Sequence, residues 1–105
     1  LFHIGHLTHL HEAKKFGEIE IVGDSSHKNF NYIPKDFKIS DRHDYFHCTS
    51  NNTIYGSQIK TFPKCNVPVV CDMSSDIFSR KIDVNKFGLI YAGAQKNLGP
   101  ACNIF

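Results

Sequence analysis

Residues 87–97 read FGLIYAGAQKN, an apolar run that passes directly into small residues and then into Lys96. Residues 66–72, NVPVVCD, form a second apolar run, which ends in the carboxylate of Asp72. Unbroken apolar runs of this kind are typical of strands that are buried in a parallel sheet. Residues 74–86 lie between the two runs and predict a short crossover with a capping serine near its start. Strand, crossover and strand in this order indicate an α/β fold.

The chain on the amino-terminal side of these runs predicts further elements. Residues 45–49, YFHCT, predict another strand, and residues 50–56 have the composition of a turn. Residues 17–23 alternate charged and β-branched side chains, which predicts a half-exposed strand. Residues 6–16 predict a helix that ends at a glycine. Residues 24–41 are rich in Ser, Asn, Asp and Lys and predict a connection.

The composition is that of an ordinary globular protein. Of the 105 residues, 41% are hydrophobic and 21% are charged, so we expect one compact domain rather than a disordered or fibrous chain. The formal charge of +2 is spread along the chain without a basic block, which argues against nucleic-acid and membrane partners. No apolar run approaches the roughly 20 residues that span a bilayer, and the first residues lack a signal-peptide pattern. We therefore expect a cytoplasmic location.

The spacing of cysteines and histidines bears on disulfides and metal binding. The sequence contains no Cys-x-x-Cys pair. This spacing favours reduced and mostly buried thiols for the four cysteines, Cys48, Cys65, Cys71 and Cys102. Histidines crowd the first dozen residues, as His3, His6, His9 and His11. They do not follow the His-Glu-x-x-His pattern of zinc enzymes, so we predict no metal site.

Three polar side chains follow predicted strands: Thr53, Asp72 and Lys96. Ligands of open parallel sheets bind beyond the carboxyl ends of the strands, so we expect these side chains to converge on one cavity. A lysine amine attacks an aldehyde when it is neutral, and a carboxylate can hold a proton on the ring nitrogen of pyridoxal phosphate. Each residue also has a simpler interpretation: Thr53 as a turn hydroxyl, Asp72 as the cap of a turn through Ser74 and Ser75, and Lys96 as an exposed loop lysine.

Longer stretches of the chain together resemble one family. They are residues 52–56 (NTIYG), 71–75 (CDMSS), 79–84 (SRKIDV) and 88–101 (GLIYAGAQKNLGPA), and the likeness runs from about Ala13 to Ala101. These stretches are similar to phosphoserine aminotransferases, which are pyridoxal phosphate enzymes of fold type I and class V. The resemblance implies that residues 1–105 form part of the large cofactor-binding domain, a mostly parallel sheet with helices. Residues 1–12 depart from the family pattern.

The resemblance also implies an activity and a role for each site residue. Enzymes of this family are homodimers that move an amino group from glutamate to 3-phosphohydroxypyruvate, which gives phosphoserine and 2-oxoglutarate in serine biosynthesis. By its position in the motif, Lys96 would bind pyridoxal phosphate covalently and move the proton at the substrate α-carbon. Asp72 would pair with the ring nitrogen, Thr53 would hydrogen-bond the phenolic oxygen side of the ring, and Gln95 would contact the cofactor phosphate.

The chain departs from the family in other respects. The family places a tryptophan on the cofactor ring, and this sequence has no tryptophan. Its arginines, Arg42 and Arg80, match no substrate-binding position, and Arg80 is expected to pair with Asp76 or Asp83. We therefore expect the 105 residues alone to bind the cofactor weakly and to be inactive. Two other classes stay open: another fold-type I pyridoxal phosphate enzyme, such as a desulfurase, and a non-catalytic module, such as a histidine-rich metal binder.

Overall fold

The computed structural model describes residues 11–35, 38–93 and 95–99. Within these ranges the chain forms short strands and short 3-10 helices that are joined by turns. The elements are η1 (Ser26–Lys28), β1 (Phe46–Thr49), β2 (Asn51–Asn52), β3 (Ser57–Gln58), β4 (Val69–Asp72), η2 (Val84–Lys86) and β5 (Leu89–Tyr91). No helix in the described part of the chain is long and apolar enough to cross a membrane.

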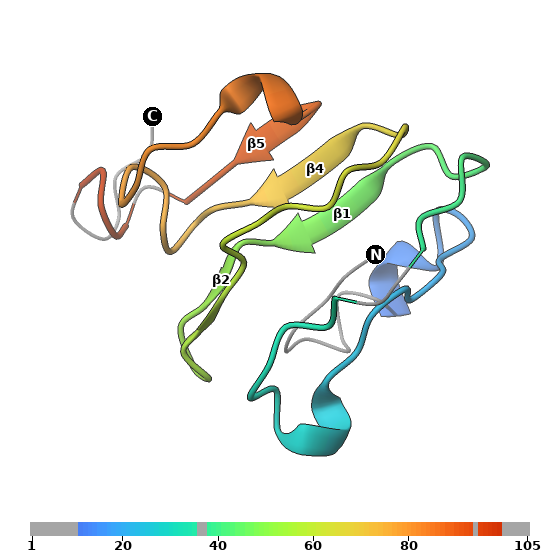
Figure 1. Cartoon of the computed structure of the whole chain (residues 1–105), viewed down its shortest axis with the longest axis horizontal. Coiled ribbons are helices and arrows are strands. Elements are labelled where there is room, and N and C mark those ends of the chain that lie inside the picture. Colours follow the sequence, from blue (N-terminus) through green and yellow to red (C-terminus); the bar gives the residue numbers. More distant parts are fainter. Residues whose placement is uncertain (1–10, 36–37, 94, 100–105) are drawn as a thin grey trace.

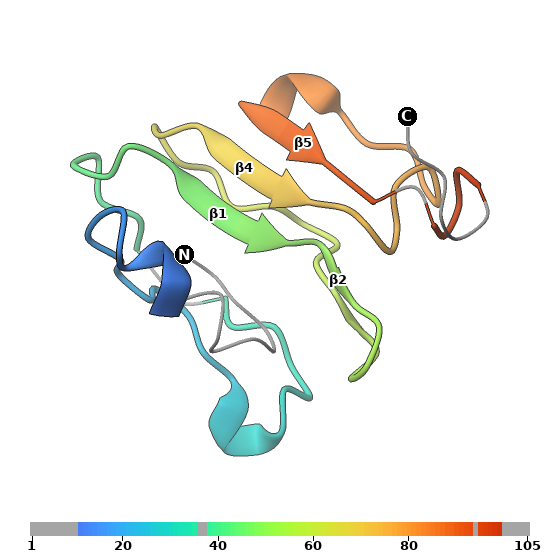
Figure 2. The same cartoon turned by 180° about the vertical axis from the view of Figure 1, so that it is seen from behind.

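A parallel sheet of three strands forms the centre of the molecule, in the order β1-β4-β5 (Figure 1). The view from behind shows the same arrangement, with β4 between the other two strands (Figure 2). These strands fall within the predicted ranges 45–49, 66–72 and 87–92, so the α/β prediction is confirmed. The expected helices are represented, among the described residues, only by a helical turn at residues 11–13 and by η1 and η2.

One face of the sheet carries the hydrophobic core. The register pairs Phe46 with Val69 and Cys48 with Cys71, and all four side chains are buried. Successive side chains of a strand point to opposite faces, so the residues between them lie on the other face. The core is completed from outside the sheet by the buried side chains of Ile59, Val67 and Met73.

The second face of the sheet is partly open. Its residues from β5 are Leu89 and Tyr91, which are 54% and 43% exposed, whereas Ile90 packs against the core. The expectation of a buried strand at this position is therefore wrong for two of the three residues of β5. The reason is that β5 lies at the edge of the sheet, and Leu89 and Tyr91 face away from the core.

A small hairpin, β2-β3, follows β1 and was not predicted. Residues 53–56 form its turn, as expected, and the Asn52 side-chain oxygen accepts hydrogen bonds from the backbone N–H groups of Ile54 and Tyr55 at 3.0 and 3.2 Å. Gly56 closes the turn with a φ of 67°, a conformation that glycine adopts without steric cost. Because β2 and β3 consist of Asn, Ser and Gln, they carry no apolar alternation by which a strand is predicted.

The amino-terminal segment agrees with the predictions only in part. Residues 11–13 are helical and a turn leads to Phe16, so the helix ends before the predicted glycine; residues 6–10 lie outside the described residues. Residues 17–23 form no strand, and that prediction is wrong. Alternating side chains define an apolar face, but a strand also needs a neighbouring strand to accept its hydrogen bonds. Within residues 24–41, the described residues 24–35 and 38–41 form no strand and only the short η1, so they are mostly a connection, as predicted.

Asp76 ties the crossover after β4 to the rest of the fold. Its side chain is buried, accepts hydrogen bonds from the Ser50 hydroxyl and from Gln58 Nε2, and lies 3.7 Å from Arg80 Nη2. The expected pairing of Arg80 with an acidic residue of the crossover is thereby confirmed for Asp76. A buried carboxylate with three partners holds its loop in one conformation, because each partner would be left unsatisfied if the loop moved.

Candidate functional site

The carboxyl ends of the three parallel strands lie at one edge of the sheet. Thr49, Asp72 and Tyr91 are paired across β1, β4 and β5, so their side chains share the partly open face. Asp72 is half-buried there. Burial raises the pKa of the Tyr91 hydroxyl. The nearby negative charge of Asp72 raises that pKa further.

The Asp72 carboxylate uses its two oxygens differently. Oδ1 accepts hydrogen bonds from the backbone N–H and the hydroxyl of Ser74, at 2.8 and 2.6 Å. Asp72 therefore does cap the turn that follows β4, which was the simpler interpretation of this residue. Oδ2 has no hydrogen-bond partner among the residues that the structure describes. One carboxylate oxygen is thus left to pair with a cation.

Lys96 lies in a turn that is hydrogen-bonded to the segment after Asp72, both before and after Lys96 in the sequence. Before it, the Gly93 backbone N–H donates a 2.9 Å hydrogen bond to the Ser74 hydroxyl. After it, Asn97 Nδ2 donates a 2.7 Å hydrogen bond to the Ile77 carbonyl oxygen. Lys96 itself is exposed, and its ammonium group has no partner within the described ranges.

Gln95 packs directly against the backbone of the same segment. A Cβ atom added at Gly93 would meet the Oε1 atom of Gln95, so a larger residue there would displace the flexible amide end of Gln95. Gln95 is otherwise exposed, as is Lys96 beside it. The small residues before Lys96 therefore bring two polar side chains close to the sheet edge.

Thr53 is exposed in the hairpin turn, and this hairpin is linked to the same segment. The Ser75 hydroxyl donates a 2.9 Å hydrogen bond to the Asn51 carbonyl oxygen and accepts one of 2.9 Å from Asn51 Nδ2. The segments that carry Thr53, Asp72 and Lys96 thus all meet at residues 72–77. Thr53 also retains its simpler interpretation as an exposed turn residue.

A histidine and a tyrosine that the sequence analysis did not single out lie on the same face as Asp72. His47 Nε2 and the Tyr91 hydroxyl are 2.8 Å apart, and their rings are tilted against each other with centroids separated by 6.0 Å. They are 44 positions apart in sequence, on the two strands that flank β4. Only the strand order brings them together, so no local signal could have identified the pair.

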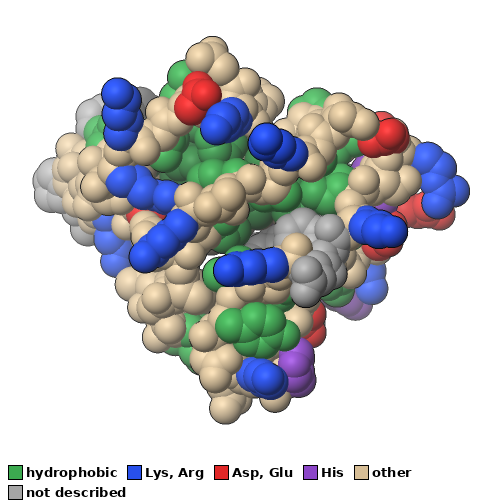
Figure 3. All heavy atoms as spheres, in the orientation of Figure 1, with side chains coloured by type: hydrophobic (Ala, Val, Ile, Leu, Met, Phe, Trp, Pro, Cys, Tyr) green, Lys and Arg blue, Asp and Glu red, His purple; other side chains and the backbone are tan. Residues whose placement is uncertain are grey.

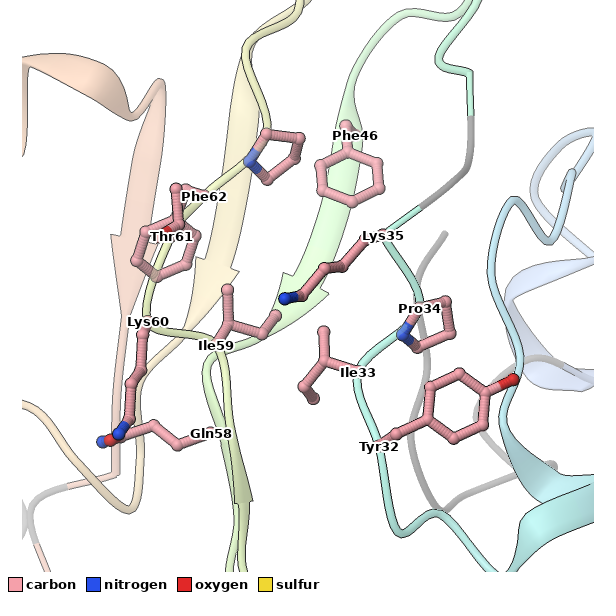
Figure 4. Close-up of a pocket in the computed structure, with 11 residues that line it drawn as sticks. Tyr32, Ile33, Pro34, Lys35, Phe46, Gln58, Ile59, Lys60, Thr61 and Phe62 are labelled. Atoms are coloured by element: carbon pink, nitrogen blue, oxygen red, sulfur yellow. The ribbon is translucent and has the colours of Figure 1, made fainter.

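A cavity of about 680 Å³ lies on the opposite face of the sheet. Its apolar lining includes Phe46, Ile59 and Phe62, and Lys35 reaches across it toward Ile59 (Figure 4). Lys and Arg side chains surround hydrophobic side chains on this side of the molecule (Figure 3). Phe46 belongs to the core face, whereas Asp72 lies on the partly open face, so this cavity is separate from the edge at which Asp72 lies.

The thiols agree with the predicted reduced state where the structure describes them. Cys48 and Cys71 are buried, Cys65 is half-buried, and all three are free. Their neighbours do not complete a metal centre: among the described residues no three His, Cys, Asp or Glu side chains are grouped to hold an ion. Cys102, His3, His6 and His9 lie outside the described residues.

Comparison with known proteins shows a consistent family. The family model described as Aminotransferase class-V matches residues 3–102. The phosphoserine aminotransferase of Flavobacterium johnsoniae is 68% identical over 90 residues, which is 86% of this chain and 25% of that enzyme. The phosphoserine aminotransferase of Parabacteroides distasonis is 60% identical over the same shares. The chain therefore spans about a quarter of the length of the curated relatives it matches.

Solved structures give the same likeness in three dimensions. The phosphoserine aminotransferase from Bacillus circulans subsp. alkalophilus superimposes with a TM-score of 0.81 at 50% identity, covering 87% of this chain and 26% of that one. A pyridoxal phosphate-bound phosphoserine aminotransferase from Trichomonas vaginalis gives a TM-score of 0.75 at 33% identity, covering 85% of this chain and 28% of that one. The predicted fold-type I arrangement is therefore confirmed.

Proposed function

Because the chain belongs to the class-V aminotransferase family, we propose that it is the part of a phosphoserine aminotransferase that holds pyridoxal phosphate. The proposed activity of the whole protein is transfer of an amino group from glutamate to 3-phosphohydroxypyruvate. The observation that carries the proposal is the meeting of the segments of Thr53, Asp72 and Lys96 at residues 72–77. Identity of 68% to a named phosphoserine aminotransferase supports this choice of substrates.

The residues at the sheet edge fit such a cofactor. Asp72 Oδ2 is without a hydrogen-bond partner in the described part of the chain, so it can pair with a protonated ring nitrogen. Lys96 is exposed and unpaired among the described residues, so its amine is accessible to an aldehyde. The Gln95 amide lies beside the Gly93 backbone, and Gln95 is exposed, so the amide is accessible to a phosphate.

Each residue then has a distinct task. Pyridoxal phosphate, when bound, supplies an aldehyde for the amino group and a ring that accepts electrons. Lys96 would bind the aldehyde carbon and afterwards move the proton at the substrate α-carbon. Asp72 would hold a proton at the ring nitrogen, the Thr53 hydroxyl would bond the phenolic oxygen side of the ring, and the Gln95 amide would donate to the phosphate.

The proposal extends to partners and location. We propose that the whole protein is a cytoplasmic homodimer that acts on small-molecule substrates. Within this chain both arginines already have protein partners: Arg80 pairs with Asp76, and Arg42 Nε contacts the Ser40 hydroxyl at 3.5 Å. The groups that grip the substrate carboxylate and phosphate would therefore come from other parts of the whole protein.

Covalent capture of the cofactor tests the proposal. Pyridoxal phosphate added to the purified chain should produce a near-visible absorbance band, and borohydride should then fix the cofactor on the peptide that contains Lys96. Lys96→Ala should abolish both signals, because the amine that forms the bond is gone. Lys86→Ala is the matched control, since Lys86 lies in η2 and is exposed like Lys96.

Two results would contradict the proposal. One is a band of equal strength in the Lys96→Ala variant, which would mean that other amines react as readily. The other is labelling spread evenly over the lysine peptides of the unmodified chain. Specific labelling at Lys96 that survives in Lys86→Ala would support the proposal.

A further inference from the structure

The side chain of Ser74 connects two parts of the proposed site. Its hydroxyl donates a 2.6 Å hydrogen bond to Asp72 Oδ1 and accepts a 2.9 Å hydrogen bond from the Gly93 backbone N–H. Gly93 begins the segment that leads to Lys96. The Ser74 hydroxyl thus joins the carboxylate on β4 to the chain after β5. It acts as a donor in one hydrogen bond and as an acceptor in the other.

Ser75 makes the corresponding connection toward the hairpin. Its hydroxyl donates to the Asn51 carbonyl oxygen and accepts from Asn51 Nδ2, both at 2.9 Å. Asn51 opens the hairpin whose turn contains Thr53. The two serines are adjacent in sequence, yet they reach segments on opposite sides of β4, because β1 and β5 flank that strand.

We propose that Ser74 and Ser75 are positioning residues that hold the three cofactor-binding segments in one arrangement, an inference that rests on the proposed function. Both donors from Ser74 converge on Asp72 Oδ1, so Ser74 decides that Oδ2 is the oxygen available to a ring nitrogen. Serine suits the task because its short side chain has few conformations to lose, and linked hydrogen bonds strengthen one another. The arrangement is therefore formed before the cofactor binds.

Hydrogen exchange on the cofactor-free chain tests the two connections separately. In Ser74→Ala the Gly93 amide should exchange about tenfold faster, as expected for the loss of one hydrogen bond, while the amides of Ile54 and Tyr55 in the hairpin turn stay protected. In Ser75→Ala the Gly93 amide should stay protected, whereas the Asn51 Nδ2 protons, which lose their Ser75 acceptor, should exchange faster. A merely destabilised protein would show faster exchange at all of these amides in both variants, which would overturn the proposal.

Cofactor binding supplies the second measurement. Ser74→Ala should weaken binding of pyridoxal phosphate by about tenfold, because Asp72 loses a hydrogen bond to its charged group. Ser74→Thr keeps the hydroxyl and should restore both the affinity and the protection of the Gly93 amide. Ser79→Ala is the matched control: its hydroxyl donates to the Asp76 carbonyl oxygen within the crossover itself and connects no two of the three segments.

The outcomes separate this inference from the proposed function. If the unmodified chain fails to bind pyridoxal phosphate at Lys96, the proposed function is wrong, and the exchange pattern still decides whether the serines connect the segments. If the unmodified chain binds the cofactor while Ser74→Ala and Ser79→Ala lose affinity equally, the positioning role of Ser74 is wrong. If Ser74→Thr has the cofactor affinity of the unmodified chain and Ser74→Cys does not, the hydroxyl is the group that the site requires.

Discussion

At the scale of single residues, the paired thiols of the core show how burial controls reactivity. Cys48 and Cys71 are fully buried, are directly paired across β1 and β4, and have their Sγ atoms 3.7 Å apart. The hydrogen bond from the Cys48 thiol to Cys71, together with burial, raises the pKa of Cys48. Alkylation requires the thiolate, so both access and chemistry protect this thiol.

We therefore expect iodoacetamide to modify Cys65 at least about tenfold faster than Cys48 in the native chain at pH 8. Burial also raises the pKa of Cys65, so its labelling should speed up as the pH is increased, but this residue is less buried than Cys48. Peptide mapping by mass spectrometry measures each cysteine separately. In urea the two rates should become equal, and equal rates in the native chain would contradict the structural burial of Cys48.

At the scale of elements, the contact between the starts of β4 and β5 depends on a glycine. Gly88 precedes β5, and its backbone N–H donates a 2.9 Å hydrogen bond to the Val69 carbonyl oxygen. A Cβ atom at this position would lie 2.7 Å from Pro68 Cβ. The proline ring is rigid, so it cannot rotate away, and β5 would have to move outward from β4.

Gly88→Ala should lower the free energy of unfolding by about 1–3 kcal/mol, the usual cost of overpacking. Gly17→Ala is the control, because nothing lies within 4 Å of a Cβ added there. That substitution should leave stability unchanged or raise it by about 0.4–1 kcal/mol, since it restricts the unfolded chain. Urea unfolding measures both, and equal effects of the two substitutions would show that β5 does not pack against Pro68 as described.

At the scale of the whole molecule, we expect these 105 residues to be insufficient for catalysis. Transamination requires the substrate to be held so that its α-hydrogen bond stands perpendicular to the cofactor ring, and charged groups that grip the substrate provide that orientation. Arg80 is committed to Asp76, and Arg42 lies in the connection before β1. Arg80 is thus held by a residue of the crossover, and no described contact joins either arginine to Lys96.

We expect the purified 105-residue chain to show no measurable transamination even when it binds the cofactor. Poor orientation alone lowers the rate on the order of 100-fold or more. The measurement is glutamate-dependent conversion of 3-phosphohydroxypyruvate, with a full-length phosphoserine aminotransferase assayed in parallel. Turnover by the chain that disappears in Lys96→Ala would show that these residues form a complete enzyme and would refute this expectation.

The strand positions and the candidate residues could be predicted because they depend on local patterns. Apolar runs at residues 66–72 and 87–92 each lead into polar groups, and the carboxyl ends of parallel strands necessarily share one edge of a sheet. The sequence therefore predicts that Asp72 and Lys96 lie near one another. The assignment of their roles came from the resemblance and is still a proposal.

Tertiary structure alone decided which of these segments touch and which surfaces are covered. Residues 17–23 have a strand pattern but form no strand, since the hydrogen bonds of a strand come from a neighbour that the pattern does not specify. The link from Ser75 to Asn51 spans 24 positions, and that from Ser74 to Gly93 spans 19. Side-chain alternation reports the polarity of a residue's own surroundings, whereas these contacts depend on strand order and register, which are set by packing between distant parts of the chain.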